Sequence, residues 1–252
     1  MEKYSVLSYI IGGYDTIKPI LYKSPNAEYI LVTDNKELKS DDWNIIYVDN
    51  FHPEDNFDLC YKIRFNPFVF VNTNIVLRID ASIQIVDNTD YLIEEYINGG
   101  YDVGLMIHPS RNTMMEEYRT WINCRQYPIE QANKCLTFMA LQGYDIENYK
   151  GLYQYCAMIQ RNNKMNDDWN SLTLSYLKYL AQSGKRIERL DQTIGSFVLN
   201  KFFNGYKIMA FSQDILRGKP FQWCQHHTGT KLNVSKPSIE PYLFNNPVNI
   251  FQ

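Results

Sequence analysis

The chain has 252 residues, 45% of them hydrophobic, which is enough to bury a sizeable core. Its net charge of −3 offers no basic field for nucleic acid, so we expect no nucleic-acid partner. Five scattered cysteines without a CxxC pair favour free thiols in a reducing compartment over a disulfide framework or a zinc site. We find no apolar run of about 18 residues and no signal-peptide pattern, and therefore expect a cytoplasmic protein without a transmembrane segment.

The first half of the chain shows short apolar segments that predict strands, each followed by a polar turn. They cover residues 4–11, 29–33 and 44–48. Residues 58–70 carry apolar side chains near helical spacing, although Pro67 limits where that helix can run. This alternation is typical of the nucleotide-binding half of an α/β protein.

The segment 74–83 predicts a strand that is buried on both faces and ends on a carboxylate. Asp80 stands where the apolar run stops, and the small residues Ala81 and Ser82 follow it. Ligands of open α/β sheets bind outside the carboxyl ends of the strands, so Asp80 could reach a divalent cation or a ribose hydroxyl. The alternative is that Asp80 only caps the next turn.

Other candidates lie near the ends of the predicted strands. Gly12 could let a nucleotide approach the backbone, or form a plain tight turn, and the chain contains neither GxGxxG nor GxxxxGK[ST]. Asp34 could bind a ribose or a base edge, or cap a turn. Lys62 and Arg64 could face a diphosphate as paired cations, or be solvated charges of a helix.

The second half is richer in helical patterns. Residues 101–107 and 151–160 predict strands, and residues 114–124, 129–141 and 167–182 predict helices. A further helix opens at residues 189–192 and continues to Phe202, and Asp191 near its start could be an N-cap. Beyond Gly218 the periodicity is poor, and no repeat or linker divides the chain.

A series of short motifs resembles a family of bacterial and plant glycosyltransferase-like proteins, whose plant members are linked to cell-wall polysaccharide and mucilage. The series covers residues 4 to about 205. Its members are Gly12-Gly13-Tyr14-Asp15, Leu31-Val32-Thr33-Asp34-Asn35, Tyr61-Lys62-Ile63, Arg78-Ile79-Asp80-Ala81-Ser82-Ile83, His108-Pro109 with Arg111-Asn112, Gly151-Leu152-Tyr153, and Asp191-Gln192 with Ser196-Phe197. No single motif is specific, but their order is.

The resemblance implies a fold of the glycosyltransferase A type, a Rossmann-like nucleotide-binding mixed sheet flanked by helices. It implies a single domain over residues 1–252. Residues 1–100 would bind the nucleotide sugar, residues 101–222 would form the acceptor and catalytic half, and residues 223–252 would form a C-terminal lid or tail.

The resemblance also implies a metal site. In such enzymes an Asp-x-Asp motif holds a divalent cation, Mn²⁺ or Mg²⁺, against the diphosphate. Asp80 and Ser82 occupy the matching positions, so a serine replaces the second carboxylate. The segment from His226 to Lys231 looks like the His-x-x-Gly-x-x-Lys element of glycogenin-type galactosyltransferases, with the lysine one residue early. It implies His226 or His227 as a metal ligand and Lys231 as a phosphate contact; alternatively, the histidines are polar surface.

We therefore expect a hexosyltransferase of polysaccharide biosynthesis that moves a sugar from a nucleotide sugar to a glycan or lipid-linked glycan. If the protein associates with a membrane, we expect it at the inner face. Retention of configuration is suggested by the Asp-Gln pair but stays open. Asp34 would hold the nucleoside, Asp191 and Gln192 would face the sugar, and His108 and Arg111 would line the cleft. The segment from Trp223 to Lys231 would close over the donor. The alternatives are a non-catalytic sugar- or nucleotide-binding protein on the same scaffold, and a nucleotidyltransferase, which expects a cation in the first turn.

Overall fold

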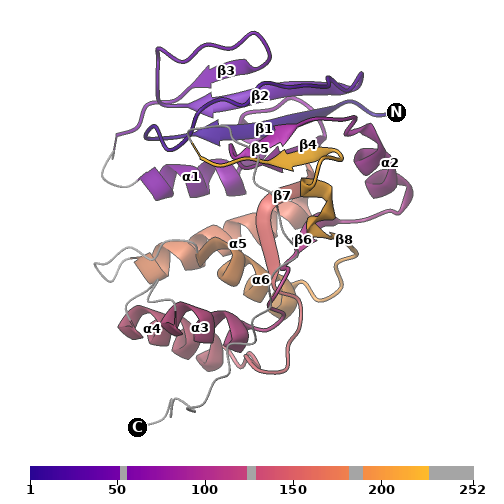
Figure 1. The fold of residues 1–252 in the computed structure, drawn as a ribbon. Coiled ribbons are helices and arrows are strands. Elements are labelled where there is room, and N and C mark those ends of the chain that lie inside the picture. Colours follow the sequence, from indigo (N-terminus) through magenta and orange to yellow (C-terminus); the bar gives the residue numbers. More distant parts are fainter. Residues whose placement is uncertain (52–55, 124–128, 182–189, 227–252) are drawn as a thin grey trace.

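The computed structural model describes residues 1–51, 56–123, 129–181 and 190–226. Its centre is a seven-stranded mixed sheet with the order β3-β2-β1-β4-β7-β6-β8 (Figure 1). The strands in that order are β3 (Asn44–Tyr47), β2 (Ala27–Thr33), β1 (Tyr4–Ile10), β4 (Ile75–Ile79), β7 (Tyr153–Arg161), β6 (Val103–Ile107) and β8 (Ile208–Phe211). The expected α/β class with a Rossmann-like mixed sheet flanked by helices is confirmed at this level.

The direction of the strands divides the sheet into two parts. Strands β1 to β4 run parallel, and β7 runs antiparallel to both of its neighbours, β4 and β6. Because the chain adds β2 and β3 on one side of β1 and β4 on the other, the order of the strands reverses between β1 and β4. In open α/β sheets, ligands bind at such a switch point, outside the carboxyl ends of the strands.

The helices whose apolar periodicity extends over many residues agree with the sequence-based expectation. Several short elements were not predicted. The helices are α1 (Asn56–Phe65), α2 (Asp90–Asn98), α3 (Met114–Asn123), α4 (Ile129–Leu141), α5 (Lys164–Ala181) and α6 (Leu190–Phe202). Short 3-10 helices cover Pro67–Val69 and Gln213–Leu216. The sequence did not indicate α2, β8 or the two-stranded antiparallel pair of β5 (Ile83–Ile85) and β9 (Phe221–Trp223). No helix within the described ranges is long and apolar enough to cross a membrane.

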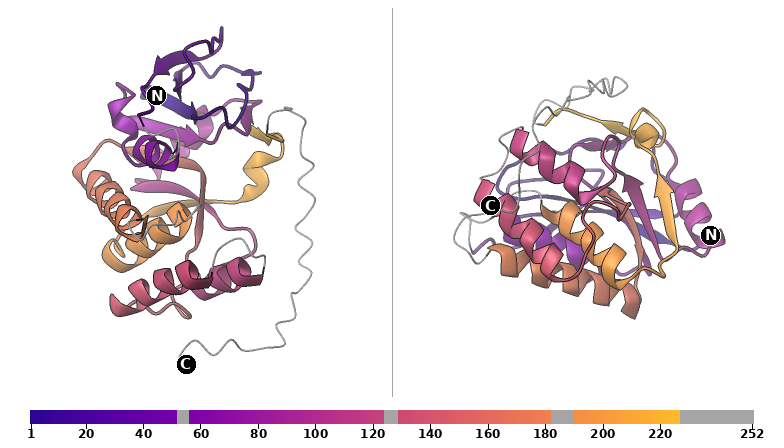
Figure 2. Two further views of the ribbon diagram at one scale, coloured as in Figure 1. Left: turned by 90° about the vertical axis from the view of Figure 1, so that its left-hand side faces the viewer. Right: turned by 90° about the horizontal axis from the view of Figure 1, so that it is seen from below.

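Alternation along the strands sends side chains into separate layers on the two faces of the sheet. On one face, Leu7 and Val76 pack with Ile63 of α1, and Leu105 packs in the cluster formed by α3 to α6. On the other face, Val6 packs with residues of α2 and of the β5–β9 pair. Figures 1 and 2 show α3 and α4 at the end of the molecule opposite to the first strands, with α5 and α6 between.

One glycine of α6 allows the helix to lie close against β7. A Cβ atom on Gly195 would come within 2.4 Å of Cε2 of Tyr155 and 2.6 Å of its hydroxyl oxygen. Tyr155 is buried at 2% exposure, so its ring has little space to move. The contact therefore fixes the distance between α6 and the centre of the sheet.

We expect Gly195→Ala to lower the free energy of unfolding by about 1–3 kcal/mol, the usual cost of overpacking a core, despite the better helix propensity of alanine. Gly205→Ala is the matched control, because no atom lies within 4 Å of the added methyl group. Urea unfolding of both variants measures the difference. Equal stability of the two variants would show that Tyr155 moves aside without cost.

Candidate functional site

A cavity of about 530 Å³ opens at the switch point between β1 and β4. The residues that line it come from the ends of β1 and β4, one side of α1, the start of β7, the first turn of α6 and the segment around β9. They are Tyr9, Ile11, Gly12, Tyr14, Asn56, Phe57, Cys60, Tyr61, Arg64, Asp80, Ala81, Ser82, Ile83, Gln154, Tyr155, Cys156, Asp191, Gln192, Gln213, Leu216, Trp223 and His226.

Two arginines and two carboxylates converge beside this cavity, and three of them, Arg64, Asp80 and Asp191, line it. Oδ1 of Asp80 accepts a hydrogen bond from Nη2 of Arg64 at 2.9 Å and another from Nη1 of Arg78 at 3.0 Å. The other terminal nitrogen of Arg64, Nη1, forms an ion pair with Asp191, the second residue of α6. Asp191 therefore lies inside the first turn of the helix and does not act as its N-cap. We call Arg64, Arg78, Asp80 and Asp191 the arginine–aspartate cluster.

Burial makes the charges of this cluster depend on one another. Arg78 is fully buried within β4. Its burial, together with the nearby charge of Arg64, lowers the pKa of Arg78, while Asp80 acts in the opposite direction. A buried guanidinium is tolerated only when it is paired, so the structure requires Asp80 as a partner of Arg78.

The turn after β1 is held by a carboxylate from β2. The backbone N–H of Gly12 donates to both carboxylate oxygens of Asp34 at 3.0 Å, and Nδ2 of Asn50 donates to Oδ2 at 2.9 Å. Gly12 has a φ of 65°, and a Cβ atom there would meet the side chain of Asn56. Gly12 lines the cavity, whereas Asp34 is not among the lining residues and holds the turn through the N–H of Gly12.

The C-terminal part of the described chain closes one side of the cavity. Strand β9 pairs with β5, and the N–H of Cys224 donates to the carbonyl oxygen of Ser82 at 2.8 Å. Nδ1 of His226 lies 2.6 Å from Oδ2 of Asp15, and its Nε2 lies 3.4 Å from the hydroxyl of Tyr14. Residues 223–226 are thus tied to the first turn of the chain. The remainder of the expected lid, with His227 and Lys231, lies outside the described residues.

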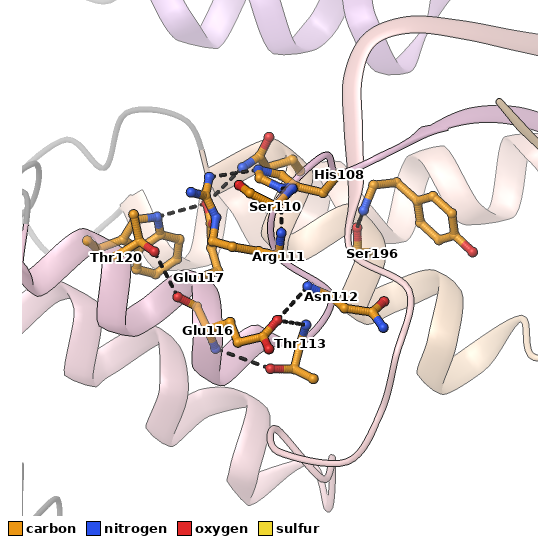
Figure 3. A network of polar contacts seen from close by, with 12 residues as sticks. His108, Ser110, Arg111, Asn112, Thr113, Glu116, Glu117, Thr120 and Ser196 are labelled. Atoms are coloured by element: carbon orange, nitrogen blue, oxygen red, sulfur yellow. Dashed lines mark hydrogen bonds and ion pairs between the residues drawn. The ribbon is translucent and has the colours of Figure 1, made fainter. Parts of the chain in front are cut away.

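A second polar network joins Gln192, in the first turn of α6, to α3 and to the loop after β6. Figure 3 shows the part of this network around Arg111 and Glu117. Nε2 of Gln192 and Nε1 of Trp121 donate to Oε1 of Glu117 at 2.7 and 3.0 Å, and Arg111 forms an ion pair with the same carboxylate. Nη2 of Arg111 lies 2.7 Å from Nε2 of His108. Gln192 therefore connects the cavity to the loop that follows β6.

The start of α3 places Glu117 in this network. Thr113 Oγ1 accepts a hydrogen bond from the N–H of Glu116 at 3.2 Å, and Oε2 of Glu116 accepts one from the N–H of Thr113 at 3.0 Å. This reciprocal pair is a capping box, which satisfies N–H groups that the first turn of a helix leaves unpaired. It fixes the beginning of the helix at Met114, three residues before Glu117.

The structure brings together most, but not all, of the residues that the sequence suggested. Gly12, Arg64, Asp80, Ser82, Asp191, Gln192 and His226 line the cavity, whereas Asp34, Lys62, His108 and Arg111 do not. Lys62 is exposed and pairs with Asp58 at 2.6 Å. His108 and Arg111 reach the cavity only through Glu117 and Gln192.

Sequence reasoning assigned no role to three charged residues on which the site depends, although Arg78 and Asp15 stand in the motif series. They are Arg78, which holds Asp80; Glu117, which holds Gln192; and Asp15, which holds His226 and also pairs with Lys18 at 2.6 Å. A signal existed for Arg78, because an arginine inside a continuous apolar strand must find a buried partner. Glu117 and Asp15 gave no such signal, since each meets its partner only through the tertiary fold.

The expected metal ligands do not form a complete set in the part of the chain that the structure describes. No group of three or more histidine, cysteine, aspartate or glutamate side chains there could hold a metal ion. Asp80 and His226 both line the cavity, but Ser82 takes the place of a second carboxylate.

Comparison with models of known protein families gives no match for this chain. Comparison with curated protein sequences gives none either. The fold and the site therefore define the class: a Rossmann-like α/β protein with a ligand-sized cavity at its switch point.

The histidine of the second network gives a prediction about pH. Burial, and then the charge of Arg111, lower the pKa of His108 to about 3. The unfolded chain binds this proton near its ordinary pKa of about 6.5, so the unfolded state is favoured as the pH falls from there towards 3. From about pH 7 to about pH 5, His108 should remove about 2 kcal/mol of stability.

Urea unfolding of the wild type and of His108→Gln at both pH values measures this contribution. We expect the variant to lose less stability than the wild type on going to the lower pH. The same loss in both proteins would contradict a neutral, buried His108.

Proposed function

We propose that the protein is a nucleotide-sugar-dependent glycosyltransferase of the glycosyltransferase A type. The observation that carries the proposal is the convergence of Arg64, Asp80 and the Asp191-Gln192 pair in one cavity at the switch point. Nucleotides bind at this place in doubly wound sheets. The volume of about 530 Å³ also lies within the range of small-molecule sites.

The walls of the cavity suit a ligand that contains both rings and phosphates. Tyr9, Tyr14, Phe57 and Trp223 line it, and aromatic side chains can stack on a base or on the apolar face of a sugar. Gly12 allows a close approach of its backbone. A nucleoside near the turn after β1 would place its diphosphate towards Arg64 and its sugar towards the first turn of α6.

The proposed reaction is attack of an acceptor hydroxyl on the anomeric carbon of the donor sugar. A new glycosidic bond forms, the bond to the phosphate oxygen breaks, and the hydroxyl proton leaves with the nucleoside diphosphate or to solvent. Negative charge grows on the departing phosphate, and Arg64 supports the transition state by stabilising that charge. Asp191 and Gln192 contact the sugar, and Glu117 holds the amide of Gln192 in one orientation.

The acceptor that we propose is a hydroxyl group of a glycan or a lipid-linked glycan in polysaccharide biosynthesis. This part of the proposal follows from the motif series. It is compatible with a protein that works at a membrane surface.

A specific observation favours one other function, a non-catalytic nucleotide- or sugar-binding protein. Among the described residues that line the cavity, the two acidic ones, Asp80 and Asp191, already pair with arginines, and Ser82 replaces a second acid in the motif. Such a protein would bind nucleotide sugars without releasing the nucleotide, so a turnover assay separates the two functions.

The test is to incubate the full chain with a panel of UDP- and GDP-sugars and mixed glycan acceptors, and to measure the release of nucleoside diphosphate. We expect one donor to give turnover above background. Asp80→Asn should lower that turnover by at least about a hundredfold, the scale of losing one electrostatic contact in an active site. Asp168→Asn, at an exposed carboxylate on α5, is the matched control.

Thermal denaturation of each variant must accompany this assay, because Asp80 is also the partner of two arginines. Near-normal turnover in a folded Asp80→Asn protein would contradict the proposed role. Binding of nucleotide sugars without any release by the wild type would establish the non-catalytic alternative.

A further inference from the structure

We propose that the cavity binds the diphosphate of its nucleotide through Arg64, supported by Arg78, without a divalent cation. This inference rests on the proposed function, and it departs from the metal site that the motif series implies. It follows from the way the charges at the inner end of the cavity are already paired.

The acidic side of the site offers little to a metal ion. Among the described residues that line the cavity, only Asp80 and Asp191 are acidic, and each of them pairs with Arg64. Oδ1 of Asp80 also accepts the hydrogen bond from Arg78. A hard divalent cation needs several oxygen ligands whose charge is not already compensated, and here both carboxylates are compensated.

The histidine does not complete a metal site in the described part of the chain. Nδ1 of His226 pairs with Asp15, which is itself held by Lys18 at 2.6 Å. Nε2 faces Tyr14 and lies 3.4 Å from its hydroxyl. One imidazole and one carboxylate that already accepts two charged hydrogen bonds are a weak donor set for Mn²⁺ or Mg²⁺.

The two arginines, in contrast, have more N–H donors than the described residues accept. Nε of Arg64 and both Nε and Nη2 of Arg78 are buried without a hydrogen-bond partner among the described residues. Two guanidinium groups on one carboxylate oxygen repel each other and are costly to bury. Such a cost suggests a functional role. Arg64 lines the cavity and Arg78 does not, so an acceptor with several anionic oxygens would contact Arg64 only.

The two arginines together carry the same formal charge as one divalent cation. Arg64 is also preorganised, because its two terminal nitrogens are held by carboxylates on different elements, Asp80 after β4 and Asp191 in α6. Each terminal nitrogen carries a second hydrogen, and through these two hydrogens the fixed fork can donate to phosphate oxygens without reorganisation. The diphosphate would bind at the edge of Arg64 that faces the cavity, while Arg78 raises the positive potential from behind.

The first experiment uses the full chain without substitutions. UDP and GDP are titrated by calorimetry, once with EDTA and once with Mn²⁺. We expect one of them to bind with a Kd that differs by less than about threefold between the two conditions, well below the tenfold step that corresponds to about 1.4 kcal/mol. Titration of Mn²⁺ alone, followed by its electron paramagnetic resonance signal, should show no bound ion.

The second experiment changes the proposed ligand. Arg64→Lys keeps the charge but loses the planar fork, and we expect it to weaken nucleotide binding by at least about tenfold in EDTA. Arg119→Lys, at an exposed arginine on α3 outside the cavity, should bind like the wild type. Thermal denaturation without nucleotide shows whether Arg64→Lys is folded, and the comparison of EDTA with Mn²⁺ on the wild type stands without this variant.

The outcomes separate the inference from the proposed function. Binding that appears only with Mn²⁺, or a bound Mn²⁺ ion without nucleotide, would overturn the metal-free site and leave the glycosyltransferase proposal in place. No binding of either nucleotide under both conditions would overturn both. Equal binding by a folded Arg64→Lys protein would remove Arg64 from the role proposed here.

Discussion

The ion pairs of Arg64 are the interaction on which the geometry of the site depends. Arg64 belongs to α1, and its terminal nitrogens meet Asp80 at the end of β4 and Asp191 at the start of α6. One side chain thus fixes three elements that are distant in the sequence. Removing one partner of such a pair typically costs about 3–5 kcal/mol, because the remaining charge stays buried. Because the buried charge of Arg64 needs both carboxylates, α1, β4 and α6 stay in place around the cavity.

The first turn of α6 connects the two parts of the sheet. Asp191 turns towards the arginine that serves the parallel strands, and Gln192 turns towards Glu117, on α3 after the strand β6. Helix α6 itself packs against β7, the strand that changes the direction of the sheet, with Gly195 allowing the close contact to Tyr155. Two adjacent residues therefore couple the arginine–aspartate cluster to the network around His108, and a displacement of α6 would affect both.

The sequence predicted those features that depend on local pattern. The strands that end before Gly12 and Asp80 follow from continuous apolar runs, and the long helices follow from their periodicity. The β5–β9 pair and the contact between Asp15 and His226, 211 positions apart, depend on tertiary packing and leave no local trace. Lys62 and Arg64 show what a local pattern cannot decide. Residues two apart on a helix point in different directions, so only one of the two side chains could face the cavity. The tertiary packing of α1 turns Arg64 towards it.

A site built from guanidinium groups differs physically from one built around a metal ion. A bound ion can be removed and replaced, whereas Arg64 and Arg78 belong to the chain, and the desolvation of their charges is part of the stability of the fold. The lowered pKa of Arg78 reflects that cost. The carboxylates of Asp80 and Asp191 compensate the buried charges of the arginines in the free protein. They also hold the side chain of Arg64 in one position. Asp80, which would hold a cation in an Asp-x-Asp site, here holds Arg64 and Arg78, and a serine in the second position of the motif is consistent with that exchange.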